Sequence, residues 1–130
     1  MITDGGTDSM QTRDVYRGTD GDTILYIIRF GVIRPNFEQK LYFSQWHFDS
    51  VLMHGTDMKR KITLAVKLRV TIPSTAVVEQ KPTDGVADTL IVETSMPLQA
   101  EVLELYVREP GAGTVKTIKG ARDITQYLEG

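Results

Sequence analysis

The hydrophobic residues of this chain alternate most regularly between Lys61 and Ile72. Every even position there is aliphatic, and the odd positions carry Lys, Arg, Thr or Ala. A period of two held over these twelve residues predicts a β-strand with one buried face and one polar face. Pro73 ends the predicted strand, because proline has no N–H to donate to a sheet.

Three further stretches have the composition of strands. Thr23 to Phe30 is a β-branched and aromatic run that ends at Gly31, Lys40 to Leu52 alternates aromatic residues, and Thr89 to Met96 alternates apolar and polar ones. β-branched and aromatic side chains favour pleated, half-buried surfaces, so all three predict strands. The segment Ala76 to Val86 contains a Pro and a Gly and is expected to form a loop.

The C-terminal third is less clear in its periodicity. In Gln99 to Glu109 the apolar residues fit both a helical spacing and a period of two. The abundance of Gln, Ala, Glu and Leu favours a helix. If the segment is a strand instead, Pro110 to Gly113 becomes a hairpin turn into Thr114 to Ile118. Ala121 to Glu129 predicts a short terminal helix.

The N-terminal segment differs from the rest of the chain. Met1 to Gly21 is rich in Gly, Thr, Asp and Ser and shows no periodicity. It predicts an irregular acidic arm, with a short edge strand near Asp14 to Arg17. The length of 130 residues is that of one domain, so residues 1–130 are expected to form a single folding unit.

Composition narrows the possible functions only slightly. The chain has no cysteine, which excludes disulfides and thiolate metal sites, and its formal net charge is −2. No run approaches the roughly 20 apolar residues of a membrane-spanning helix, and the first residues lack the features of a signal peptide. No cofactor is expected.

Catalytic motifs are not convincing in this sequence. His47 and His54 have only Asp49 and Asp57 as sequence-near candidates for a metal site, without a recognised ligand spacing. The run from Gly111 to Thr117 lacks the spacing of a phosphate-binding loop. The best candidate for an enzyme or ligand-binding barrel is an aromatic cluster, made of Tyr42, Trp46, His47 and Phe48. We therefore expect a protein that binds and assembles rather than an enzyme.

The strand from Lys61 to Ile72 also carries a concentration of positive charge. Five cations and no acid lie between Lys59 and Thr71. Lys61, Lys67 and Arg69 share the odd face with threonines, a combination that suits a phosphate backbone. The alternative is an ordinary solvated strand face. The opposite aliphatic face must be covered, and a partner subunit is one candidate for that cover.

Two of these strands resemble sequences in the coat proteins of single-stranded RNA bacteriophages. The resemblance rests on Arg60-Lys61-Ile62-Thr63-Leu64-Ala65-Val66-Lys67 and on Thr89-Leu90-Ile91-Val92-Glu93-Thr94-Ser95-Met96-Pro97-Leu98, and it extends over residues 59 to 130. It implies an α+β fold with an N-terminal hairpin, an antiparallel sheet of about five strands, and one or two short C-terminal helices that pack on a partner subunit's sheet. Ala65 stands where well-known members have lysine.

The resemblance implies specific roles for three groups of residues. Contacts to genomic RNA would come from Lys61, Thr63, Lys67, Arg69, Thr71, Thr89 and Glu93. The dimer interface would consist of Ile62, Leu64, Val66, Leu68, Leu90, Val92, Val102, Leu105 and Tyr106. An inter-dimer loop would contain Glu79, Gln80, Lys81, Pro82, Thr83, Asp84 and Gly85. The partners would be a second copy of the chain and RNA, in a virion assembled in the host cytoplasm.

The leading hypothesis is therefore a capsid protein that dimerises, self-assembles into an icosahedral shell and encloses RNA. The alternative is an all-β structural module of a phage virion, such as a decoration, tail or head-joining protein, without RNA binding. The two hypotheses differ at residues 99–118, where the first requires a helix and the second a hairpin.

Overall fold

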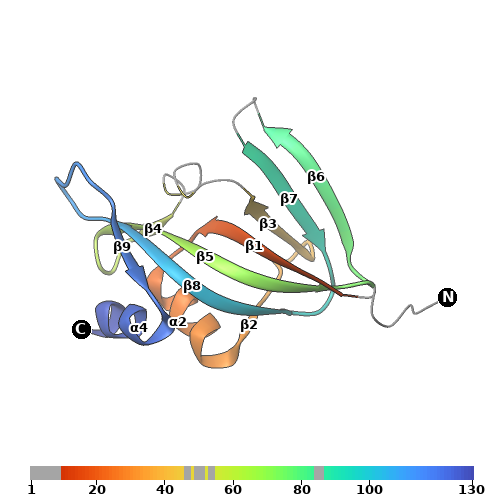
Figure 1. The fold of residues 1–130 in the computed structure, drawn as a ribbon, viewed down its shortest axis with the longest axis horizontal. Coiled ribbons are helices and arrows are strands. Elements are labelled where there is room, and N and C mark those ends of the chain that lie inside the picture. Colours follow the sequence, from red (N-terminus) through yellow and green to blue (C-terminus); the bar gives the residue numbers. More distant parts are fainter. Residues whose placement is uncertain (1–9, 46–47, 49–51, 53–54, 84–86) are drawn as a thin grey trace.

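The computed structural model describes residues 10–45, 48, 52, 55–83 and 87–130. Within these residues the chain forms one antiparallel sheet with two helices, a mostly β α+β fold (Figure 1). Both helices pack on the same side of the sheet, below β5 and β8 in the view of Figure 1. We call this side the helix face and the other side the open face.

The sheet contains nine strands in the described part of the chain. They are β1 (Met10–Gly18), β2 (Val32–Ile33), β3 (Lys40–Ser44), β4 (Thr56–Asp57), β5 (Ile62–Pro73), β6 (Val77–Thr83), β7 (Ala87–Glu93), β8 (Leu98–Arg108) and β9 (Lys116–Lys119). The strand order is β2-β8-β5-β1-β3-β7-β6, with β4 paired to β5 and β9 paired to β8. The sheet has more strands than the five expected from the sequence.

Strand β5 is the centre of the fold and confirms the prediction made from its alternating pattern. It pairs along its length with β1 on one side and β8 on the other. Its even-numbered side chains from Leu64 to Val70 are fully buried in a cluster that includes Ile24 of α2 and Ile124 of α4. The regular alternation therefore reflects a strand whose even-numbered side chains are buried between the sheet and the chain's own helices.

Helix α2 (Gly21–Phe30) corrects the prediction of a strand at residues 23–30. The side chain of Asp20 accepts a hydrogen bond from the backbone N–H of Thr23 at 2.7 Å, and Gly31 ends the helix in a left-handed conformation at φ 71°. Ile24 and Ile27 are buried at the helical spacing of three. These caps and this spacing outweigh the strand preference of β-branched residues.

Strand β8 corrects the second misassignment, the helix favoured for residues 99–109. It pairs with β5, and Pro110 to Gly113 lie in the connection to β9, so the hairpin alternative is the one observed. A register shift between Lys67 and Leu68 leaves Leu103 without a Cα partner on β5. This bulge explains why the apolar residues of β8 mimic a helical period.

Two other expectations about the strands of the sheet are corrected. The segment expected to be a loop, 76–86, contains strand β6, which pairs with β7 from Val77 to Thr83. The acidic arm contains β1, which is central rather than at an edge, because it lies between β5 and β3. The C-terminal helix is confirmed as α4 (Ala121–Glu129), with Ile124 and Leu128 buried.

The residues expected at a dimer interface are already buried in a single chain. They are Ile62, Leu64, Val66, Leu68, Leu90, Val92, Val102, Leu105 and Tyr106, each at most 9% exposed. All except Tyr106 belong to the core that α2 and α4 cover. Tyr106 lies on the open face with Ala65 and Leu52. The chain's own helices therefore cover this aliphatic face in a single copy of the chain.

Candidate functional site

The cations of β5 that we expected to contact RNA lie beside acids on the neighbouring strands. Arg69 is opposite Asp14 of β1 on one side and Glu101 of β8 on the other. Its Nε atom donates to Asp14 Oδ1 at 3.0 Å. The hydrogen bond to Asp14 and the charge of that carboxylate raise the pKa of Arg69 above its ordinary value.

Lys67 has a similar environment one row along the sheet. It lies opposite Glu104 of β8 and Tyr16 of β1, and its Nζ atom is 5.8 Å from the centre of the Tyr16 ring. The two cations therefore share the open face with three acids, Asp14, Glu101 and Glu104. This part of the sheet does not present an excess of positive charge to a polyanion.

The remaining residues of the expected RNA site are dispersed. Lys61 and Thr63 lie near β4, whereas Thr71 lies at the opposite end of β5, beside Thr12. Thr89 and Glu93 belong to β7, which is separated from β5 by β1 and β3. The structure does not bring the seven residues together. The expected inter-dimer residues Glu79 to Thr83 belong to β6, and Asp84 and Gly85 lie outside the described residues.

An aromatic cluster covers the open face beside Lys67. The rings of Phe48 and Tyr106 stack with centroids 4.2 Å apart, and Tyr16 lies 6.1 Å from Tyr106. Burial raises the pKa of Tyr106, and the hydrogen bond from its hydroxyl to Glu104 raises it further. Tyr42 lies on β3 outside this cluster, while Trp46, His47 and His54 lie outside the described residues.

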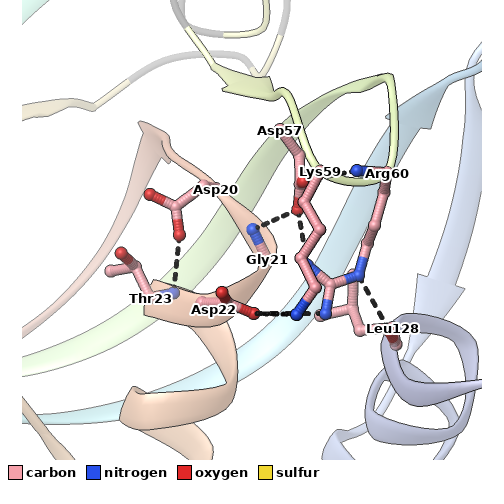
Figure 2. A network of polar contacts seen from close by, with 8 residues as sticks. All are labelled: Asp20, Gly21, Asp22, Thr23, Asp57, Lys59, Arg60 and Leu128. Atoms are coloured by element: carbon pink, nitrogen blue, oxygen red, sulfur yellow. Dashed lines mark hydrogen bonds and ion pairs between the residues drawn. The ribbon is translucent and has the colours of Figure 1, made fainter.

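A polar network on the other side of the molecule joins three parts of the chain (Figure 2). Asp57 is 2% exposed, and its Oδ2 accepts hydrogen bonds from the backbone N–H of Gly21 at 2.8 Å and from Arg60 Nη1 at 2.8 Å. Arg60 Nε donates to the carbonyl of Leu128 at 2.8 Å. The network therefore connects the start of α2, the β4–β5 turn and the end of α4.

Opposing effects set the charge states in this network. Burial acts to raise the pKa of Asp57, but the hydrogen bonds from Arg60 and Gly21 outweigh it and leave the pKa below its ordinary value. Burial acts to lower the pKa of Arg60, and its bonds to Asp57 and Asp22 outweigh that effect and raise it. Both groups are held in their charged forms, as a structural ion pair requires.

Exposed apolar side chains provide a different kind of candidate site. Seven large apolar residues are exposed in the described chain. Apart from Met58 in the β4–β5 turn, five of them occur near strand ends or turns: Met10 (61% exposed), Phe30 (56%), Phe37 (96%), Val77 (60%) and Met96 (66%). Sequence reasoning missed all five. The available signal was a large apolar residue beside turn-forming ones, as in Pro35-Asn36-Phe37 and Ser95-Met96-Pro97.

Strand pairing and turn contacts place four of these residues at one end of the sheet, and Phe30 lines a hollow with Thr12 and Thr71 near the same end. Met10 is opposite Pro73, Val77 is opposite Glu93, and the backbone N–H of Thr94 donates to the carbonyl of Gln39 at 2.9 Å. The start of β1, the end of β5, the β5–β6 connection and the end of β7 meet there, on the right of Figure 1. We call the five residues Met10, Phe30, Phe37, Val77 and Met96 the apolar end.

Comparisons with known proteins do not assign the chain to a group. No protein-family model matches it, and no curated protein or solved structure matches it either. Among the described residues, no helix is long and apolar enough to cross a membrane. The same part of the chain contains no group of three or more His, Cys, Asp or Glu side chains arranged to hold a metal ion.

Proposed function

We propose that the protein is a non-catalytic structural module that self-associates through the apolar end. The occurrence of five exposed apolar side chains toward this end of the sheet is the observation that carries the proposal. Single exposed apolar residues are normal on protein surfaces, but a group of them marks an interaction site. Burial of these side chains against another chain would remove them from water.

A second copy of the chain suits this surface better than a strongly charged partner. Arg34, Glu38 and Glu93 are exposed near the apolar end, and Lys40 is partly exposed opposite Glu93. A surface with both signs of charge can face its own copy across a two-fold axis, with each cation near an acid of the other chain. The proposed unit is therefore a homodimer or a larger symmetric assembly.

Among the virion roles expected from the sequence, three observations support the structural module without RNA binding over the RNA-packaging coat protein, although the described part of the chain has two helices and is not all-β. Residues 98–119 contain the β8–β9 hairpin, where the coat protein requires a helix. The aliphatic face of β5 is covered by the chain's own helices, and Lys67 and Arg69 have acidic neighbours. A decoration, tail or head-joining role is consistent with self-association and requires no RNA contact.

The experiment compares the two ends of the molecule. The double substitution Phe37→Asp and Met96→Asp places charges in the apolar end, and Met58→Asp is the matched control because Met58 is also highly exposed, at 82%. Sedimentation velocity over a series of protein concentrations measures the mass of each variant. We expect a concentration-dependent oligomer for the unmodified chain and the control, and a monomer for the double variant.

Two results would contradict the proposal. One is an unmodified chain that stays monomeric at every concentration. The other is a double variant that associates as strongly as the control, which would place the interface elsewhere. Circular dichroism on each sample verifies that both variants keep the fold. Absorbance at 260 nm of the purified protein tests RNA packaging separately, and bound RNA would favour the coat protein hypothesis.

A further inference from the structure

A hollow lies at the end of the sheet opposite the apolar end. It has a volume of about 590 Å³ and is lined by β4, the start of β5, the end of β8 and the turn that follows β8. Thr63 is directly opposite Arg108 on one side and Thr56 on the other. Lys61, two residues before Thr63, also lines the hollow. Hydroxyl-bearing and cationic residues therefore line the same hollow.

The two cations of this hollow are not neutralised in the way that Lys67 and Arg69 are. Its two acids are already engaged by other groups: Asp57 by Arg60, and Glu109 by Lys116 Nζ at 3.3 Å and the Tyr127 hydroxyl at 3.1 Å. Among the residues that the structure describes, neither Lys61 nor Arg108 forms an ion pair. The hollow thus has two available positive charges in a chain of net charge −2.

The backbone of Lys61 has an unusual conformation in this hollow. Lys61 has φ 60°, in the left-handed region that non-glycine residues seldom adopt. The backbone N–H of Lys61 donates to the carbonyl of Asp57 at 2.7 Å and closes the β4–β5 turn. A glycine would relieve the strain at this position, so the presence of lysine is consistent with a use for its charge.

We propose that this hollow binds a phosphate monoester. A guanidinium donates two parallel hydrogen bonds to a phosphate group, an ammonium adds a point charge, and threonine hydroxyls donate further bonds. The volume falls in the range of small-molecule pockets, about 300–1,000 Å³, and leaves room for an organic group beside the phosphate. The exposed side chain of Met58 and the ring of Pro110 line the same hollow and offer that group apolar contact.

An NMR titration of the full chain tests the proposal with phenyl phosphate as the probe. Chemical shifts of the backbone amides of Lys61, Thr63 and Gly111 are followed in ¹H–¹⁵N spectra. We expect saturable shifts at these amides, and about tenfold weaker binding in Lys61→Gly and in Arg108→Gln, because each removes a charge-assisted hydrogen bond. Lys61→Gly also removes the strained backbone, so the fold is retained. The matched control Arg122→Gln removes an exposed cation of α4 and is expected to bind as the unmodified chain does.

Three outcomes would overturn the proposal. The first is an absence of saturable shifts with phenyl phosphate. The second is equal binding by the Lys61→Gly variant, the Arg108→Gln variant and the unmodified chain. In the third, an oligouridylate shifts these amides while phenyl phosphate does not, which would assign the hollow to nucleic acid. Self-association is measured separately and does not depend on this site, so the two proposals can fail independently.

Discussion

The position of Gly21 shows how closely the polar network is packed. A Cβ atom built on this residue would lie 2.6 Å from Asp57 Oδ2 and 2.7 Å from Arg60 Nη1. Real Cβ atoms do not approach other heavy atoms so closely, so a larger residue here would displace the Asp57 and Arg60 side chains from this arrangement. The sequence suggested Asp57 only as a sequence-near candidate for a metal site, and it could not indicate that this side chain binds the start of a helix 36 residues earlier.

Replacement of Asp57 by Asn tests the contribution of this carboxylate. The substitution removes a buried negative charge that accepts three hydrogen bonds, and it leaves Arg60 without its closest acid. We expect a loss of about 2 kcal/mol in the free energy of unfolding at pH 7, the size of a hydrogen bond to a charged group. Urea denaturation measures the loss, and Asp123→Asn on the exposed side of α4 is the control.

The same residue predicts how stability depends on pH. The pKa of Asp57 is lowered in the folded chain, so the unfolded state takes up the proton first as the pH falls. The stabilisation is present above the unfolded pKa of about 3.9 and is lost as the pH falls through the folded value. The difference between the unmodified chain and Asp57→Asn should therefore shrink below about pH 4. A constant difference from pH 7 to pH 3 would contradict this prediction.

At the scale of elements, sequence patterns identified some strands and misassigned others for physical reasons. The alternation in β5 was sufficient because every even residue is buried. Helix α2 was missed because its β-branched and aromatic residues favour strands, although Asp20 and Gly31 provide both caps. Strand β8 was misassigned because helix-favouring residues fill it and a bulge interrupts its alternation. Pairing with β5 decides its structure, and pairing cannot be inferred from one segment.

A comparison of two leucines tests the bulge in β8. Leu105 is fully buried opposite Val66, whereas Leu103 is half-buried at the bulge and has no partner on β5. We expect Leu105→Ala to lower the free energy of unfolding by about 3 kcal/mol, because it creates a cavity in the core. Leu103→Ala should cost about 1 kcal/mol, since less apolar area is lost. Similar losses in thermal or urea unfolding would mean that the register of β8 is different.

At the scale of the whole molecule, the placement of charge explains why the candidate site was only partly predictable. The cations of β5 were visible in the sequence, but their neighbours on the open face come from residues 14, 101 and 104. These partners are brought together only by the order of strands. Lys61, which precedes β5, differs from these cations, because the two acids near it, Asp57 and Glu109, are engaged by other groups. The apolar end likewise combines residues from four separate regions of the sequence.

The double substitution of Lys67 and Arg69 by Ser tests the charge balance of the open face. Both cations lie beside acids, so their removal should not alter binding to a generic RNA, measured by filter retention at low salt. We expect weak, salt-sensitive binding in both the unmodified chain and the variant, within about a factor of three. A large loss of RNA binding in a variant that stays folded would restore the RNA-facing role of β5.

The hydrogen bond from Arg60 to the carbonyl of Leu128 has a consequence for the order of events during synthesis. Ile24 and Ile27 emerge from the ribosome early, yet Ile124 and Leu128, which cover the same core, are made about a hundred residues later. A nascent chain interrupted before α4 exposes the apolar core surface that α4 covers, and chaperones and proteases recognise such surfaces. Translation must therefore pass α4 before the core can close, and interrupted products should be cleared rather than accumulate.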